Sequence, residues 1–161
     1  MALKRWQFAE TLEHTDLNDM ISDFPKSQVV GMVPAAISNQ SSSASYAGTP
    51  EMAQQVRPIL GRYLHVKFFT SVSGGGTGSI KVDLVGPTGT DTLATITTTS
   101  AGGEVKEATY DLSALGVNGD MRGEDATLNF YLKTTAGTVT VAGMILMNGE
   151  ASSSNDYLVP H

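Results

Sequence analysis

The chain has 161 residues, which is enough for one domain with a buried core and some additional segments. It contains no cysteine, which excludes disulfide scaffolds, thiolate metal sites and cysteine nucleophiles. Its 10 basic and 16 acidic residues give a net charge of −6, so we expect no binding to nucleic acid. Only 16% of the residues are charged, below the roughly 25% of an ordinary soluble protein. The composition favours a β-rich structural or binding protein.

Residues 1–33 are predicted to form an N-terminal anchor segment with one short helix. Four apolar side chains have the spacing i, i+3, i+4 and i+7, which places them on one helix face. They are Leu17, Met20, Ile21 and Phe24. Thr15 can cap this helix and Pro25 ends it. Because so short a helix is not stable alone in water, its apolar face must pack against its own domain or another chain.

Neither a signal peptide nor a membrane span is expected. The basic residues near the N-terminus are followed by acidic residues and not by an apolar run. No stretch reaches the roughly 18 apolar residues of a spanning helix, and the best run, residues 139–147, has the length of a strand. We therefore expect synthesis in a cytoplasm.

Residues 34–56 are predicted to be a linker with a short helix. The stretch 34–49 has one large aliphatic side chain, Ile37, and no charge, so it cannot bury enough apolar surface to fold by itself. It is flexible, or it is ordered by lying along a partner. Thr49 and Pro50 are typical of a helix start, and one or two turns are expected after them.

Residues 57–150 are predicted to form an antiparallel β-sandwich. Apolar and polar side chains alternate with a period of two, as in strands with one face in the core and one in water. The runs are residues 62–72, 79–84, 92–99, 105–112, 127–133 and 138–147. Glycine-rich turns separate them. If residues 28–33 add a further strand, the fold class is all-β with a jelly-roll-like arrangement.

The sequence offers no pattern that supports an enzyme or a cofactor. The three histidines, His14, His65 and His161, are not at ligand spacing, and the H-E-x-x-H and G-x-S-x-G motifs are absent. The glycine-rich stretch 74–81 lacks the G-K-[ST] ending of a phosphate loop and the helix that follows such a loop. A hairpin is therefore the better interpretation. A glycan hydrolase would need paired carboxylates on facing positions, and no such pattern is evident.

One loop is rich in oxygen ligands of the kind that Ca²⁺ prefers. Its candidate residues are Asp111, Asn118, Asp120, Glu124 and Asp125. Their spacing does not match an EF-hand, and the same residues are ordinary turn formers. We therefore predict no metal site, and keep a calcium loop as the alternative.

The N-terminal segment carries a second pattern. Aromatic residues precede Glu10, Leu12 and the run Asp16-Leu17-Asn18, just before the predicted helix. This segment resembles the opening of many tailed-bacteriophage fibre and minor structural proteins. The resemblance implies an anchor that docks onto the virion. The Thr- and Gly-rich sandwich is also similar in style to the jelly-roll domains of phage fibre heads and capsid decoration proteins.

The resemblance implies a virion structural protein, such as a tail fibre or a capsid decoration protein, with other virion proteins as partners. The docking residues would be Trp6, Phe8, Leu17, Met20, Ile21 and Phe24. The C-terminal tail, residues 151–161, would lie on a neighbouring subunit. We expect a homo-oligomer, with a trimer favoured. The candidate subunit contact is a sandwich face carrying Tyr63, His65, Tyr131 and Lys133.

A carbohydrate-binding module or receptor-binding adhesin is the alternative function. The loops at residues 74–78 and 118–125 would form the glycan site. Strand-face tyrosines could stack on sugars, although such side chains more often support packing. The two functions are compatible if the protein is a fibre tip that attaches to a host surface glycan. Measurable glycan affinity separates the alternative from a purely structural role.

Overall fold

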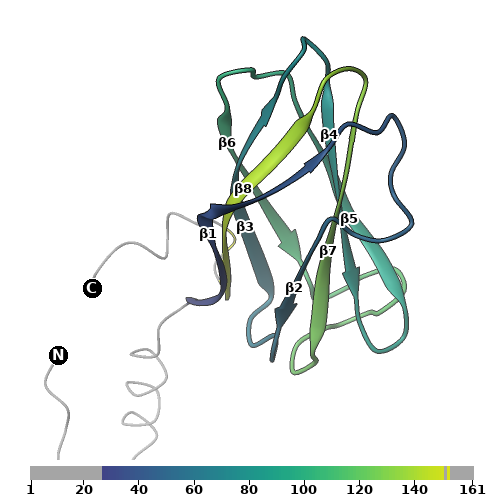
Figure 1. Cartoon of the computed structure of the whole chain (residues 1–161). Helices are drawn as coiled ribbons and strands as arrows, with labels where there is room; N and C mark the ends of the chain where they lie inside the picture. The colour runs from purple at the N-terminus through teal and green to yellow at the C-terminus, as the bar shows by residue number, and fades with distance from the viewer. Residues whose placement is uncertain (1–26, 151, 153–161) are drawn as a thin grey trace, which may run out of the picture.

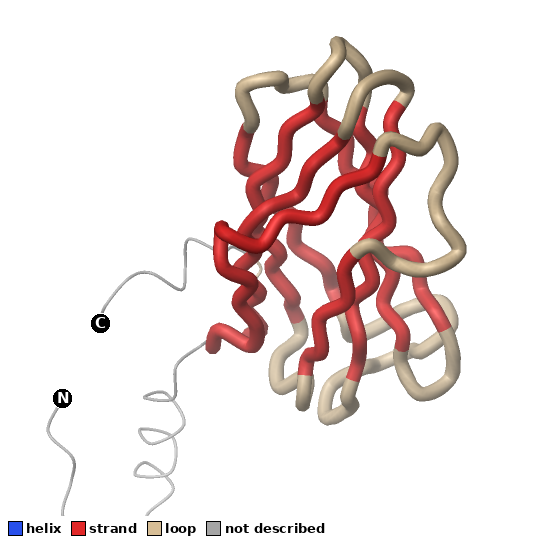
Figure 2. Tube along the Cα trace, viewed as in Figure 1, coloured by secondary structure: helices blue, strands red, loops and turns tan. Residues whose placement is uncertain are grey.

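The computed structural model describes residues 27–150 and residue 152, with side chains from residue 38 onward. Eight strands account for most of this part of the chain, and Figure 2 shows no helix in it. The strands are β1 (Ser27–Ser41), β2 (Met52–Val56), β3 (Tyr63–Val72), β4 (Gly78–Val85), β5 (Thr90–Thr98), β6 (Glu104–Asp111), β7 (Ala126–Thr134) and β8 (Val139–Gly149). The predicted N-terminal helix, all six predicted docking residues and the predicted tail apart from Ser152 lie outside the described residues.

The strands form two four-stranded antiparallel sheets that pack face to face (Figure 1). One sheet has the order β1-β8-β3-β6 and the other β2-β7-β4-β5. Strands that follow one another in sequence therefore often change sheet, and the order is that of the double Greek key of an eight-stranded jelly roll. The prediction of an all-β, jelly-roll-like sandwich is confirmed.

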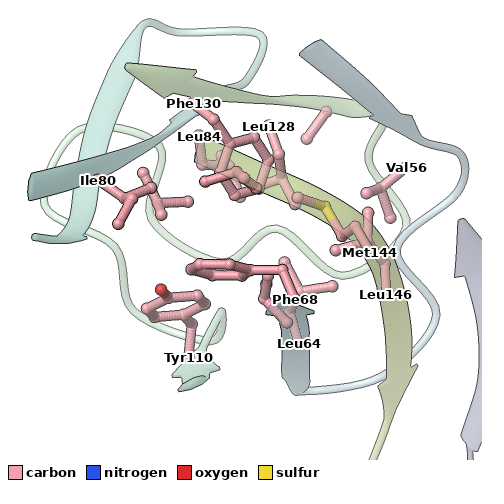
Figure 3. Packing of buried hydrophobic residues seen from close by; sticks show 14 of the residues in the cluster. Val56, Leu64, Phe68, Ile80, Leu84, Tyr110, Leu128, Phe130, Met144 and Leu146 are labelled. Carbon is pink, nitrogen blue, oxygen red and sulfur yellow. The ribbon is translucent and has the colours of Figure 1, made fainter. Parts of the chain in front are cut away.

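The core lies between the sheets, where the inward side chains of both meet (Figure 3). Leu64, Val66 and Phe68 of β3 are buried as their alternation predicted. Phe68 meets Phe130 of the opposite sheet edge to face, with ring centroids 6.4 Å apart. Burying a large apolar side chain contributes about 1.5–3 kcal/mol, so these inward rows are the main source of stability.

Strand β8 contains a bulge that its apolar spacing requires. Val141 and Met144 are both buried although three positions separate them, an odd number that would place them on opposite faces of a regular strand. Phe68 pairs with Met144 and Phe69 with Ala142, which leaves Gly143 as the extra residue. Its positive φ of 58° is readily adopted by glycine.

The predicted linker with a short helix is wrong. Residues 34–41 continue β1, which pairs with β8, and residues 52–56 form β2, which pairs with β7. The sequence did not show these strands because the strands to which they are hydrogen-bonded, β8 and β7, are far away in the sequence. An edge strand also needs few apolar side chains of its own. The predicted boundary at residue 33 therefore divides a strand, and the described sandwich begins at Ser27.

None of the described residues forms a helix long and apolar enough to cross a bilayer.

Candidate functional site

The four predicted subunit-contact residues do not share a face. Tyr63 and His65 belong to β3, whereas Tyr131 and Lys133 belong to β7 in the other sheet, so the two pairs lie on opposite sides of the sandwich. Alternation shows which side chains point away from the core, but not which sheet their strand joins. His65 is also 0% exposed, and its Nδ1 lies 2.8 Å from the hydroxyl of Thr109. The predicted single face is therefore wrong.

The outer face of the β2-β7-β4-β5 sheet carries polar side chains in neighbouring rows. Cross-strand pairing places Lys81 opposite Tyr131, and Asp83 opposite both Asn129 and Thr92. We call this surface the polar face. It comprises Ser79, Lys81, Asp83, Thr92, Thr95, Asn129, Tyr131 and Lys133. Its centre brings hydrogen-bond donors, acceptors and an aromatic ring together on one side of the sheet.

A chain of interactions fixes the centre of the polar face. Lys81 Nζ lies 2.6 Å from Asp83 Oδ2, and the hydroxyl of Thr92 donates to Asp83 Oδ1 at 2.8 Å. These two partners compensate the burial of the Asp83 carboxylate. Lys81 Nζ also lies 4.3 Å from the ring centroid of Tyr131, a cation–π contact. The centre of the face is thus preorganised.

Tyr46 completes the polar face, and the sequence analysis missed it because it fell in the predicted linker. Lys133 Nζ lies 4.6 Å and Lys81 Nζ 5.7 Å from the centroid of its ring. The segment before it is held in place because the carbonyl of Ser43 accepts the N–H of Thr134 at 2.8 Å. As the only aromatic residue in 34–49, Tyr46 was a signal that this stretch packs on something.

The candidate calcium ligands do not converge. No group of three or more acidic or imidazole side chains suited to a metal occurs among the described residues. Three of the candidates instead pair with arginines: Arg62–Asp111, Arg122–Asp120 and Arg57–Asp125. The hydrogen bond from Arg62 holds the pKa of Asp111 below its ordinary value, and that from Arg122 lowers the pKa of Asp120 to about 2. Asn118 binds Asp91.

A second surface lies on the outer face of the β1-β8-β3-β6 sheet. We call it the apolar strip. It consists of Phe69, Val105 and Ile145, with 41%, 59% and 39% exposure. Phe69 and Val105 are direct cross-strand partners, and the Phe69 ring lies over Gly103, where a Cβ would overlap it. Ile145 pairs with Lys67 on β3. Three large apolar side chains thus face outward on three adjacent strands.

No family model matches the chain, and no curated protein matches it. Among solved structures it is similar to a carbohydrate-binding module of Cellvibrio mixtus lichenase 5A in complex with cellotriose (15% identity, 77% of this chain and 99% of that chain, TM-score 0.42). It is also similar to the structure of infectious bursal disease virus, Gx strain (15% identity, 76% of this chain and 32% of that chain, TM-score 0.44). A third similar structure is the N-terminal cellulose-binding domain of Cellulomonas fimi beta-1,4-glucanase C (13% identity, 72% of this chain and 79% of that chain, TM-score 0.43). These likenesses concern the β-sandwich, and nothing about a ligand or a partner follows from them.

Proposed function

We propose that the chain is a structural component of a bacteriophage virion. Its N-terminal segment attaches it to the particle, and its jelly roll is packed or projected there as a fibre or decoration domain. The observation that carries this proposal is the apolar strip. The resemblance of residues 6–18 to phage fibre and minor structural proteins supports it. The role is one of assembly and includes no catalytic step.

The apolar strip suits a contact with another protein. Isolated exposed apolar residues are common on monomers, whereas apolar side chains gathered on one surface are typical of an interface. Phe69 and Val105 form such a group, since they are paired across adjacent strands and both exposed. The low charge of the chain agrees with a surface that neighbouring subunits cover. The neighbours are other virion proteins or further copies of this chain, with a trimer favoured.

The proposal places the chain in the particle after synthesis in the host cytoplasm. The test is mass spectrometry and immunogold electron microscopy of purified particles, with an antibody raised against residues 27–150. We expect the chain to copurify with particles in a fixed ratio to the major capsid protein, and the antibody to label one structure. If the chain stays in the particle-free supernatant, the proposal is wrong.

A second candidate function is that of a carbohydrate-binding module or receptor-binding adhesin, and the polar face favours it. Sugar sites combine aromatic rings, which cover the apolar face of a pyranose, with hydrogen-bonding groups around them. Tyr46 and Tyr131 provide such rings, and Asn129 and the exposed Thr95 provide polar side chains on the same face. Both functions can coexist, because the two surfaces lie on opposite sheets.

A glycan array probed with the full chain tests this second function. We expect hits that disappear with Tyr46→Ala and with Tyr131→Ala. Tyr63→Ala, on the other sheet, is the matched control and should keep them. An array without hits, or hits that survive both polar-face substitutions, would remove the polar face as a glycan site.

A further inference from the structure

Two ammonium groups converge on one aromatic ring at the polar face. Lys133 Nζ and Lys81 Nζ lie 4.6 Å and 5.7 Å from the centroid of Tyr46. The negative face of the ring attracts each cation. The site thus gathers positive charge beside an aromatic ring, which suits an anionic ligand.

The two lysines differ in their counter-charges. Lys81 pairs with Asp83 at 2.6 Å and is already neutralised. The lysine ion pairs among the described residues involve Lys67, Lys81 and Lys106, and Lys133 has none. The carboxylate of Glu51 accepts the backbone N–H of Leu132 at 2.9 Å, and no ion pair between Glu51 and Lys133 occurs among the described residues. Lys133 is therefore the charge that a ligand can neutralise.

We propose that Lys133 and Tyr46 bind an acidic saccharide, with its carboxylate paired with Lys133 and its sugar ring against the edge of the Tyr46 ring, since the lysine side chains lie over the ring face. This inference rests on the second candidate function and specifies its ligand class. A nucleic acid is disfavoured because the chain as a whole carries a net charge of −6. An acidic sugar matches the two features of the site, an aromatic ring that can contact its apolar surface and a lysine that has no ion pair among the described residues.

The site is held in place before a ligand arrives. The carbonyl of Ser43 is fixed to β7 through Thr134, and Glu51 is fixed to the same strand through the backbone of Phe130 and Leu132. The segment that carries Tyr46 runs between these two attachments. Binding therefore needs little ordering of the chain, which lowers its entropic cost.

The test uses the full chain and polysaccharides that differ in charge. Affinities are measured for polygalacturonate, its fully methyl-esterified form, hyaluronate and polysialate at low salt. At least one of the three acidic polymers should bind, and esterification of polygalacturonate should abolish any binding to it. Lys133→Gln should weaken binding at least about tenfold, and about 0.5 M salt should do the same. Lys67→Gln, on the opposite sheet, is the control and should leave the affinity unchanged.

Each outcome is decisive. Failure of all three acidic polymers overturns the acidic-saccharide site, as does equal affinity for polygalacturonate and its ester. Binding that Lys133→Gln leaves unchanged, whatever the effect of Lys67→Gln, shows that the site does not use Lys133 and also overturns it. If neutral glycans bind at Tyr46 and Tyr131 while acidic ones do not, only the inference about charge fails. If no glycan binds at all, the second candidate function fails with it.

Discussion

The carboxamide of Asn148 makes two hydrogen bonds with the backbone of Gly61. Its Oδ1 accepts the Gly61 N–H at 2.7 Å, and its Nδ2 donates to the Gly61 carbonyl at 3.0 Å. The same carboxamide accepts from Leu60 and donates to Tyr63, so it is fully satisfied although buried. It thereby fixes the β2–β3 connection to the end of β8. A Cβ at position 61 would overlap the backbone of Gly149, so only glycine allows this approach.

Substitution of Asn148 should destabilise the fold. Asn148→Leu leaves two backbone N–H groups and two carbonyls without their partner, and we expect a loss of about 2–4 kcal/mol in the free energy of unfolding. Urea denaturation of the full chain measures it. Asn129→Leu on the half-buried polar face is the control and should cost well under half as much. Equal effects of the two substitutions would contradict the role given to Asn148.

Asp91 should stabilise the β6–β7 loop in a pH-dependent way. Its carboxylate accepts the N–H groups of Val117 and Asn118 at 2.7 Å and 3.0 Å. Burial raises the pKa of Asp91, but the hydrogen bonds from these two residues outweigh it, so the pKa is below its ordinary value. The stabilisation is therefore complete above the ordinary pKa and decreases as the pH falls below it.

The variant Asp91→Ala should lose about 2–4 kcal/mol at pH 7. Its deficit relative to the wild type should shrink when unfolding is measured below about pH 3. Asp125→Ala is the control and should have a small effect. The carboxylate of Asp125 is exposed, and its ion pair with Arg57 is long, at 3.7 Å. A deficit that stays constant with pH would show that the charge of Asp91 is not what holds the loop.

Tyr110 should make the fold sensitive to alkali. It is 8% exposed and belongs to the core between the sheets (Figure 3). Its hydroxyl has no hydrogen-bond partner among the described residues. Burial raises the pKa of Tyr110 to about 12, above the value of 10.0 for an ordinary tyrosine. Because the unfolded chain loses this proton first, stability on the order of 2–3 kcal/mol should be lost between pH 10 and 12.

Tyr110→Phe removes both the titrating group and the unpaired hydroxyl. We expect it to be neutral or stabilising by about 1 kcal/mol at pH 7, and to flatten the loss of stability above pH 10. Thermal unfolding at pH 7, 10 and 11.5 measures it. Tyr63→Phe, which is half-buried, serves as the control. A clear destabilisation at pH 7 would mean that the hydroxyl has a partner.

The apolar strip should mediate self-association. Val105→Lys places a charge at its most exposed position and should shift the full chain from oligomer to monomer in sedimentation equilibrium. Thr95→Lys, exposed on the opposite sheet, should leave the oligomer intact. If the oligomer persists in Val105→Lys, or if the wild-type chain is a monomer, the apolar strip does not mediate self-association.

Period-two alternation predicted the strands of the sandwich well where each strand has one buried face. The run from Leu64 to Phe68 is an example, since its inward side chains are those that the pattern selects. The alternation could not show that β3 and β7 lie in different sheets. For that reason Tyr63 and Tyr131 were placed on one face, although the strand order separates them.

Residues 34–41 of β1 and the whole of β2 were not predicted as strands, because pairing with strands far away in the sequence forms them. β1 is an edge strand whose Ser38 and Gln40 are exposed, so its sequence looks like that of a linker. Pro50 suggested a helix start, yet Glu51 and Met52 pair with β7 instead. Tyr46 lies between these strands, and its approach to Lys133 follows only from the folded chain.

The most direct test of the proposed function is a lysine-acetylation footprint of the purified virion. Lys67 lies beside Ile145 of the apolar strip and its side chain is 48% exposed, whereas Lys133 lies on the opposite sheet. The reactivity of Lys67 relative to Lys133 is compared between the particle and the Val105→Lys chain in solution. We predict that the ratio falls at least about tenfold in the particle, because a neighbouring subunit covers the strip. An unchanged ratio, or particles that lack the chain, would contradict the proposed function.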